Sequence, residues 1–218
     1  MTSFVVAIDG PAASGKGTLA RRLGEKFALA HLDTGKLYRA TAFLALEAGD
    51  NPAEADKAAA AARRVTPELL GERRLLNENI AAAASIVAAI PAVRDALLGM
   101  QRAFAAHPTP PAIGAVLDGR DIGTSICPDA DVKLFITASA EARAARRAKE
   151  LRERGAPAIY SDVLQDMKER DARDSGRRVA PLAAAPDAVV IDTTSLDADQ
   201  ALEHAAGIIA RALAARDR

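Results

Sequence analysis

The residues best suited to chemistry near the start of the chain are a lysine and the glycines around it. The spacing G-x-x-x-x-G-K occurs in the run Gly10-Pro11-Ala12-Ala13-Ser14-Gly15-Lys16-Gly17-Thr18. An apolar run, Phe4–Asp9, precedes it and a helical pattern follows, which is the context in which this motif binds phosphate. Backbone N–H groups of such a loop converge on an anion, and Lys16 adds a point charge at the helix N-terminus. The pattern predicts a phosphate site; the plainer alternative is a glycine-rich turn between a strand and a helix.

The residue that follows Lys16 is a glycine, where nucleotide-switch proteins place a Ser or Thr that binds Mg²⁺. The hydroxyl comes one position later, at Thr18, and one helical position turns a side chain by about 100 degrees. We therefore expect Thr18 to face phosphate oxygens, with Mg²⁺ held largely by the phosphates and by water. This spacing favours small-molecule kinases over GTPase switches.

Two further clusters follow predicted strands, where open parallel sheets bind ligands. They are Asp33-Thr34-Gly35-Lys36-Leu37-Tyr38-Arg39 and Asp118-Gly119-Arg120-Asp121-Ile122-Gly123-Thr124. An arginine can clamp a phosphate with its planar fork, and a neighbouring aspartate can accept from an exocyclic amine. The plainer alternatives are a helix start capped by Asp33 and a structural turn. The residue types favour ligand sites.

A third cluster is Arg170-Asp171-Ala172-Arg173-Asp174-Ser175-Gly176-Arg177-Arg178. On a continuous helix Arg170, Arg173, Arg177 and Asp174 would share one face. If Gly176 ends the helix, Arg177 lies just past its cap instead. A solvated face of ion pairs is the ordinary explanation of such charges. The more specific explanation is that these arginines neutralise a transferring phosphoryl group.

The sequence offers no strong general base. His31, His107 and His204 are isolated, and we expect each to be structural or exposed. This fits phosphoryl transfer to a phosphate acceptor, which is already ionised at neutral pH and needs mainly positioning and charge neutralisation.

Alternating strand and helix patterns must position these clusters, and they predict an α/β fold with a parallel sheet. The expected strands are Phe4–Asp9, His31–Leu32, Ile113–Leu117, Val132–Ile136 and Ala188–Ile191. The expected helices are Gly15–Phe27, Lys36–Ala48, Ala92–Ala105, Ala140–Arg152, Tyr160–Asp174 and Ala198–Ala215. The last helix carries a clear apolar stripe.

Two segments interrupt this alternation. Residues 49 to about 78 are rich in Ala, charges and Pro, and we expect a partly helical insertion there, with the alanine tract Ala58–Ala62 on its surface. Residues 153–158 form a Gly/Pro hinge between charged helices. Such a hinge suits a flap that excludes water from a phosphoryl-transfer site, although a plain helix–helix connection is an equal alternative.

Composition bounds the class of protein. The chain has 218 residues, a formal net charge of zero and a single cysteine, Cys127. These values favour one compact domain and disfavour a nucleic-acid partner, a disulfide or a cysteine-rich metal site. The start of the chain does not read as a signal peptide, and charges interrupt every long apolar run. We expect a cytoplasmic monomer without a membrane partner.

Taken in order, the motifs resemble those of bacterial cytidylate kinases, in the nucleoside-monophosphate kinase group of P-loop kinases. The resemblance rests on residues 8–18, 33–39, 118–124, 170–175 and 179–182, and on Asp187 and residues 191–193. It implies a P-loop NTPase-type three-layer sandwich with a mostly five-stranded parallel sheet. It also implies one domain over 1–218, with a small monophosphate-binding insert near 49–90 and a short lid hinged at 153–159.

The resemblance implies an enzyme that phosphorylates CMP, and dCMP, from ATP with Mg²⁺, in pyrimidine nucleotide metabolism. Residues 10–18 would bind ATP, and Lys16, Arg170 and Arg173 would act on the transferring group. The CMP site would consist of Thr34, Tyr38, Arg39, Ser85, Arg94, Arg120, Asp121, Arg170, Asp174 and Arg177. Ser85, Arg94 and Asp121 would read the cytosine edge. No direct metal ligand is implied; Thr18 and Asp118 are candidates, Asp118 through water.

Three features depart from the family pattern. Residues 65–80 are too short and irregular for the small antiparallel sheet often inserted there, Lys36 adds a charge beside the acceptor motif, and the match around Ser85 and Arg94 is weaker. The rival hypotheses are a P-loop kinase for another acceptor, such as UMP or a hydroxylated acid, and a non-catalytic nucleotide-binding switch. Gly17 and the arginine cluster argue against the switch.

Overall fold

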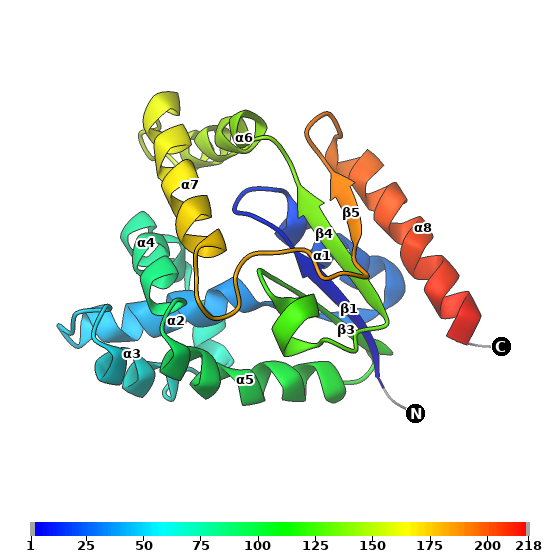
Figure 1. Cartoon of the computed structure of the whole chain (residues 1–218), viewed down its shortest axis with the longest axis horizontal. Helices are drawn as coiled ribbons and strands as arrows, with labels where there is room; N and C mark the ends of the chain where they lie inside the picture. Colours follow the sequence, from blue (N-terminus) through cyan, green and yellow to red (C-terminus); the bar gives the residue numbers. More distant parts are fainter. Residues whose placement is uncertain (1–2, 217–218) are drawn as a thin grey trace. The chain divides into compact units, whose positions relative to one another are not determined.

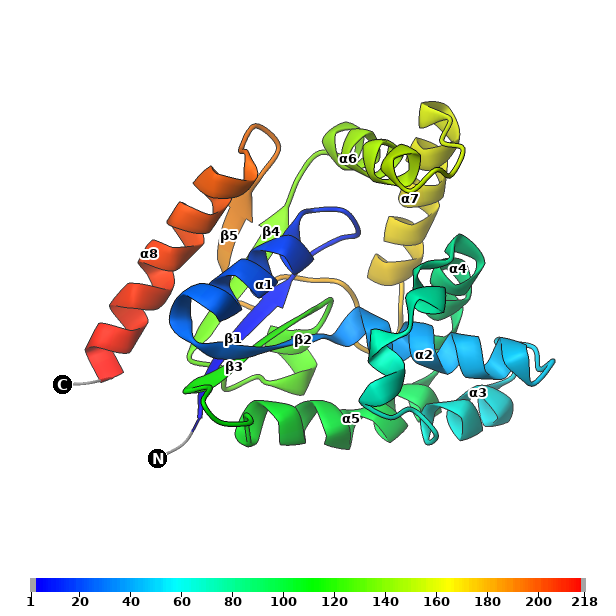
Figure 2. The same cartoon turned by 180° about the vertical axis from the view of Figure 1, so that it is seen from behind.

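The computed structural model describes residues 3–216, and a five-stranded sheet organises it. The strands are β1 Phe4–Asp9, β2 Leu29–Asp33, β3 Gly114–Gly119, β4 Val132–Thr137 and β5 Val189–Asp192. Their order across the sheet is β2-β3-β1-β4-β5; Figure 1 labels four of these strands and Figure 2 also labels β2. The pairs of β1 with β3, β1 with β4, and β4 with β5 are parallel. The predicted α/β class and parallel sheet are confirmed, with each predicted strand found to within a few residues.

The chain forms two compact units. The first holds most of the sheet and comprises the chain up to Leu32 and again from Ala105; the second is Asp33–Phe104. The predicted single domain with inserts at 49–90 and 153–159 stays a prediction.

In the first unit, helices α1 (Lys16–Phe27) and α8 (Ala198–Arg216) pack against each other and against the sheet (Figure 2). Alternate residues of β1 meet the apolar stripes of both helices, and the core contains Val6, Ile8, Leu23 and Ile209, all fully buried. This packing fixes the end of β1 relative to the start of α1, where the glycine-rich loop lies.

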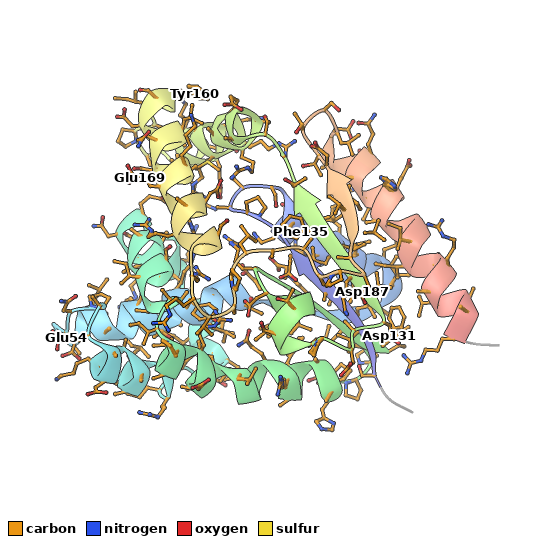
Figure 3. The ribbon with its side chains drawn as sticks, viewed as in Figure 1. Glu54, Asp131, Phe135, Tyr160, Glu169 and Asp187 are labelled. Atoms are coloured by element: carbon orange, nitrogen blue, oxygen red, sulfur yellow. The ribbon has the colours of Figure 1, made fainter. Side chains whose placement is uncertain are left out.

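Helices α6 (Ala140–Glu153) and α7 (Tyr160–Ser175) form a second cluster in the same unit, through Ala148, Leu151, Val163 and Met167 among others. The hydroxyl of Ser139 caps α6 by accepting from the backbone of Ala142. Tyr160, at the start of α7, is exposed (Figure 3). The predicted hinge is a connection between two helices, and its role as a lid stays a prediction.

The second unit is helical: α2 (Thr34–Glu47), α3 (Ala55–Ala62), α4 (Glu78–Val87) and most of α5 (Pro91–Ala106). Two short 3₁₀ turns, η1 (Glu68–Gly71) and η2 (Arg73–Leu76), stand between α3 and α4. The expectation that Ala58–Ala62 lies on the surface is wrong for most of the tract. Four of its alanines are buried, because small side chains let α3 pack closely on α2.

Within residues 3–216, no single helix is long and apolar enough to cross a membrane. The pair α4–α5 passes that test only when taken together across a 100° bend, by length and composition alone.

Candidate active site

The loop between β1 and α1 needs glycine at two of its positions. Gly10 has a φ of 152°, and a Cβ there would lie 2.0 Å from the carbonyl oxygen of Ile136. Gly15 has a φ of 89° and caps α1. Lys16 begins the helix, and its Nζ donates to the carbonyl of Pro11 at 3.3 Å. The loop therefore ends at a helix N-terminus with a lysine in the first turn, an arrangement suited to an anion.

Side chains from other elements hold this loop from two sides. Arg143 of α6 donates from Nη1 to the carbonyl of Ala12 at 3.3 Å. Thr193, just after β5, donates from its hydroxyl to the carbonyl of Ser14 at 3.1 Å. Within the described residues, the buried Oγ of Ser14 has no hydrogen-bond partner. A loop fixed by these two bonds, with a buried hydroxyl that has no protein partner in the described part of the chain, suits a ligand with polar oxygens.

Arg143 also connects the loop to α7. Its Nε donates to the carbonyl of Ala138, and its Nη2 lies 2.7 Å from Oδ2 of Asp171. The Arg143 side chain is 6% exposed. One buried guanidinium therefore joins the loop of residues 10–18, the end of β4 and α7.

Asp9, the last residue of β1, connects the loop to the turn after β3. Its carboxylate accepts from the backbone of Ile122 at 2.7 Å and of Gly123 at 2.8 Å. Burial raises the pKa of Asp9 to about 6, against the lowering effect of these two hydrogen bonds. The turn that carries Arg120 and Asp121 is thus fastened to the residue directly before Gly10.

Asp118 lies in β3 beside the start of α1. A Cβ on Gly17 would lie 3.6 Å from Oδ2 of Asp118, while Nε2 of His31 donates to Oδ1 at 2.7 Å. His31, which is isolated in the sequence, is thus paired with Asp118 in the fold. In the sheet Ile8 pairs with Asp118, which brings this carboxylate next to the end of β1.

Asp174 of α7 lies at the centre of an arginine cluster. It is 1% exposed, Nε of Arg120 donates to its Oδ2 at 3.0 Å, and Arg177 donates to its Oδ1. Burial would raise the pKa of Asp174, but the charges of Arg120, Arg177 and Arg170 outweigh it and hold that pKa below its usual range. Arg173 on the same helix is exposed. Helix α7 ends at Ser175 with Gly176 as its cap, so Arg177 lies just past the helix.

The second unit holds the other predicted acceptor residues. Ser85 and Arg94 are buried, and the guanidinium of Arg94 lies 5.8 Å from the ring centre of Tyr38. Thr34 is also buried, at the start of α2. Nη1 of Arg39 donates to the carbonyl of Leu75 at 2.9 Å.

The structure thus groups the predicted site residues into two sets. One set, in the first unit, is the loop of residues 10–18 with Arg120, Asp121, Arg170, Asp174 and Arg177. The other, in the second unit, is Thr34, Tyr38, Arg39, Ser85 and Arg94. Their joint role in one acceptor site stays a prediction.

The sequence assigned no site role to four residues that organise the first set, Asp9, His31, Arg143 and Thr193, although Asp9 and Thr193 lie within motifs that support the family resemblance. Asp9 carried a usable signal, because an acid that ends an apolar strand directly before a phosphate loop is an unusual choice. The others act over long sequence separations, such as 179 residues between Thr193 and Ser14, which no local pattern reveals.

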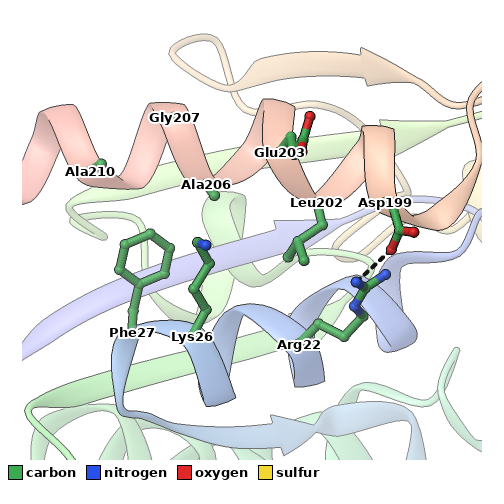
Figure 4. Close-up of a pocket in the computed structure, with 9 residues that line it drawn as sticks. All are labelled: Arg22, Lys26, Phe27, Asp199, Leu202, Glu203, Ala206, Gly207 and Ala210. Atoms are coloured by element: carbon green, nitrogen blue, oxygen red, sulfur yellow. Dashed lines mark hydrogen bonds and ion pairs between the residues drawn. The ribbon is translucent and has the colours of Figure 1, made fainter.

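A groove of about 570 Å³ lies between α1 and α8, away from the residues discussed above (Figure 4). Its lining includes Lys26, Phe27 and Leu202, and an ion pair of 2.6 Å between Arg22 and Asp199 bridges the helices there. None of these residues is among the predicted site residues.

The oxygen donors beside the loop fit Mg²⁺. Asp118 supplies a carboxylate and Thr18 an exposed hydroxyl, and oxygen is the ligand type that Mg²⁺ prefers. Within residues 3–216 there is no cluster of three His, Cys, Asp or Glu side chains that would bind a metal by themselves. The donor set therefore suits an ion that arrives with phosphates and water.

Comparisons with known proteins agree with this geometry. A family model described as cytidylate kinase matches residues 6–211. The cytidylate kinase of Rhodospirillum rubrum is 58% identical over 207 residues, which cover 95% of this chain and 97% of that protein. The cytidylate kinase of Granulibacter bethesdensis is 55% identical over 208 residues, covering 95% and 97%. A solved structure of an uncharacterized protein from Eubacterium ventriosum has a TM-score of 0.53 at 15% identity and covers 94% of this chain and 98% of that one, a likeness of fold.

Proposed function

This chain belongs to the cytidylate kinase family, and we propose that it transfers the γ-phosphoryl group of ATP to CMP, and to dCMP, with Mg²⁺. The expectation of family and enzyme class is confirmed. The observation that carries the proposal is the conformation of residues 10–18, which end at the N-terminus of α1 with Lys16 in its first turn.

For the donor, we assign residues 10–18 to the phosphates of ATP. The backbone N–H groups of the loop and the start of α1 attract the anion, and Lys16 neutralises charge as the γ-phosphoryl group moves. Arg143 and Thr193 keep the loop in place, so little reorganisation is needed when ATP binds.

For the acceptor, we assign Arg39 and Arg120 to the phosphate of CMP, with Thr34 and Tyr38 beside them. Ser85, Arg94 and Asp121 are assigned to the cytosine edge, where Asp121 accepts from the exocyclic amine and Arg94 donates to the ring carbonyl and nitrogen. The low pKa of Asp174 keeps it ionised at neutral pH, so it can hold the arginines beside it in a fixed arrangement.

For the chemical step, an oxygen of the acceptor phosphate attacks the γ-phosphorus in line, and the bond to the leaving ADP oxygen breaks. The acceptor oxygen is already ionised, so the protein need not remove a proton. Lys16, Arg170 and Arg173 are assigned to neutralising the charge of the transferring group. Bound Mg²⁺, near Asp118 and Thr18, would offset the charge of the nucleotide phosphates.

The proposal is tested by steady-state rates with ATP·Mg²⁺ and a panel of acceptors: CMP, dCMP, UMP, AMP and shikimate. We expect the highest kcat/KM for CMP and dCMP; faster turnover of UMP or shikimate would assign another acceptor. Tight ATP binding with no CMP-dependent formation of ADP would instead identify a nucleotide-binding switch. Lys16→Ala should lower kcat by about 100-fold or more in a folded protein, and a loss of only a few fold would contradict the role of Lys16.

The monomeric state, the cytoplasmic location and the lack of nucleic-acid and membrane partners stay predictions.

A further inference from the structure

The segment Glu68–Leu76 consists of the two 3₁₀ turns η1 and η2, and both contact α2 (Figure 2). Leu75, at the end of the segment, is 1% exposed and anchors it in the core of the second unit. Four-residue 3₁₀ turns have little stability of their own, so tertiary contacts must fix their place.

Arg74 supplies contacts of this kind. Its Nη1 lies 2.8 Å from Oε1 of Glu47 at the end of α2, and its guanidinium lies 4.6 Å from the ring centre of Phe43. The neighbouring Arg73 is exposed, as are most residues of the segment. Arg74, the residue directly before Leu75, thus holds this part of the segment against two residues of α2.

The carbonyl of Leu75 in turn holds Arg39. Nη1 of Arg39 donates to that carbonyl at 2.9 Å, across 36 residues of sequence. Arg39 is on the same helix as Phe43 and Glu47, one and two turns before them. The segment therefore binds α2 at three successive turns, and the contact nearest the N-terminus of α2 is the guanidinium.

We propose that the Glu68–Leu76 segment positions Arg39 for the acceptor phosphate, with Arg74 as the residue that fixes the segment on α2. This inference rests on the proposed function of Arg39. A long arginine side chain loses much rotamer freedom when it binds an anion, and a carbonyl that orients the guanidinium beforehand removes part of that cost. A guanidinium has five N–H donors, so one bond to a carbonyl is compatible with a two-point grip on phosphate.

The test compares Arg74→Ala with Arg73→Ala, which removes an adjacent exposed arginine. Arg74→Ala should raise the KM for CMP about fivefold, since it removes the exposed ion pair with Glu47 and the cation–π contact with Phe43, along with a 3.4 Å ion pair to Glu72 inside the segment. kcat at saturating CMP and the KM for ATP should stay unchanged, and Arg73→Ala should leave all three unchanged. Glu47→Gln should also raise the KM for CMP, although it removes a negative charge. A lower KM for CMP in Glu47→Gln would mean that Arg74 binds the phosphate itself.

Cytidine, as a competitive inhibitor without a phosphate, separates positioning from support of the fold. Its inhibition constant should be the same in the parent chain and in Arg74→Ala. An equal loss for cytidine and CMP would show that the segment merely supports the second unit, and would overturn the proposal, as would an unchanged or lower KM for CMP.

Arg39→Ala distinguishes this inference from the function on which it rests. It should raise the KM for CMP about 100-fold, as expected for loss of a charge-assisted two-point contact. If Arg39→Ala has this effect and Arg74→Ala has none, the positioning role fails and the assignment of Arg39 stands. If Arg39→Ala itself leaves the KM for CMP unchanged, the assignment of Arg39 fails.

Discussion

At the scale of single residues, three arginines of the first unit, Arg120, Arg170 and Arg177, surround one carboxylate, that of Asp174. The side chains of Asp174 and Arg177 are almost fully buried, and that of Arg120 is 16% exposed. These charged groups therefore interact mainly with one another and little with water. Removing one partner from such a group costs more than the pair contributes, because a charge stays buried without compensation.

We predict that Asp174→Asn lowers the free energy of unfolding by about 3 kcal/mol at neutral pH. The matched control is Asp166→Asn, an exposed residue of the same helix, which should change it by less than about 0.5 kcal/mol. Urea unfolding of both variants measures the difference. Because the pKa of Asp174 is lowered on folding, its contribution is complete above the usual range of Asp and is lost as the pH falls toward the lowered value. Equal stability of the two variants would contradict this role.

The sequence identified residues whose types are unusual for their place in the local pattern. They are glycines that bound a loop, and acids and arginines that follow an apolar strand. The sequence could not show which of them pair. Arg120 and Asp174 are 54 positions apart, and His31 and Asp118 are 87 apart. Such pairs follow from how strands and helices pack in the tertiary structure, which local spacing leaves undetermined.

At the scale of elements, Arg143 connects three parts of the first unit: the loop of residues 10–18, the end of β4 and α7. Its bonds to Ala12, Ala138 and Asp171 use all three nitrogens of the guanidinium. A lysine could not reproduce this fork, because it has a single nitrogen.

We predict that Arg143→Ala raises the KM for ATP about tenfold and lowers the free energy of unfolding by about 3 kcal/mol. The reason is that the loop carbonyl of Ala12 loses its donor and Asp171 loses its partner. Lys149→Ala, an exposed change on the same helix with a 3.9 Å ion pair, should alter neither. Steady-state kinetics at varied ATP and urea unfolding measure both effects. If Arg143→Ala changes the KM for ATP and the free energy of unfolding as little as Lys149→Ala does, the link between the loop and α7 contributes to neither.

The same scale explains which elements the sequence could predict. The strands and the amphipathic helices α1 and α8 stood out because their apolar spacing matches a sheet or a helix face. Helices α3 and α4 are short and consist largely of alanine, a residue found both in cores and on surfaces, so their sequences do not identify the buried face. The burial of Ala58 and its neighbours depends on close contact with α2, which is a property of the tertiary structure.

At the scale of the whole molecule, Asp9 combines a structural advantage with an electrostatic cost. It fastens the end of β1 to the turn at Ile122 and Gly123, yet its charge is buried in the sheet-bearing unit. Its pKa is raised from 3.8 to about 6, with burial as the largest cause. The folded chain therefore binds this proton more tightly than the unfolded chain does.

A raised carboxyl pKa makes the contribution of Asp9 to stability fall as the pH rises through the window from about 4 to about 6. We predict that the free energy of unfolding of the parent chain, minus that of Asp9→Asn, decreases by about 2 kcal/mol between about pH 4.5 and pH 7. Taking this difference removes the opposite contribution of carboxylates such as Asp174. The backbone amides of Ile122 and Gly123 donate to Asp9, and their NMR chemical shifts should titrate near pH 6 in the parent chain. This measurement needs no variant. Titration of both amides near pH 4 would show that Asp9 is charged without cost, so that the fastening of β1 to the turn carries no electrostatic penalty.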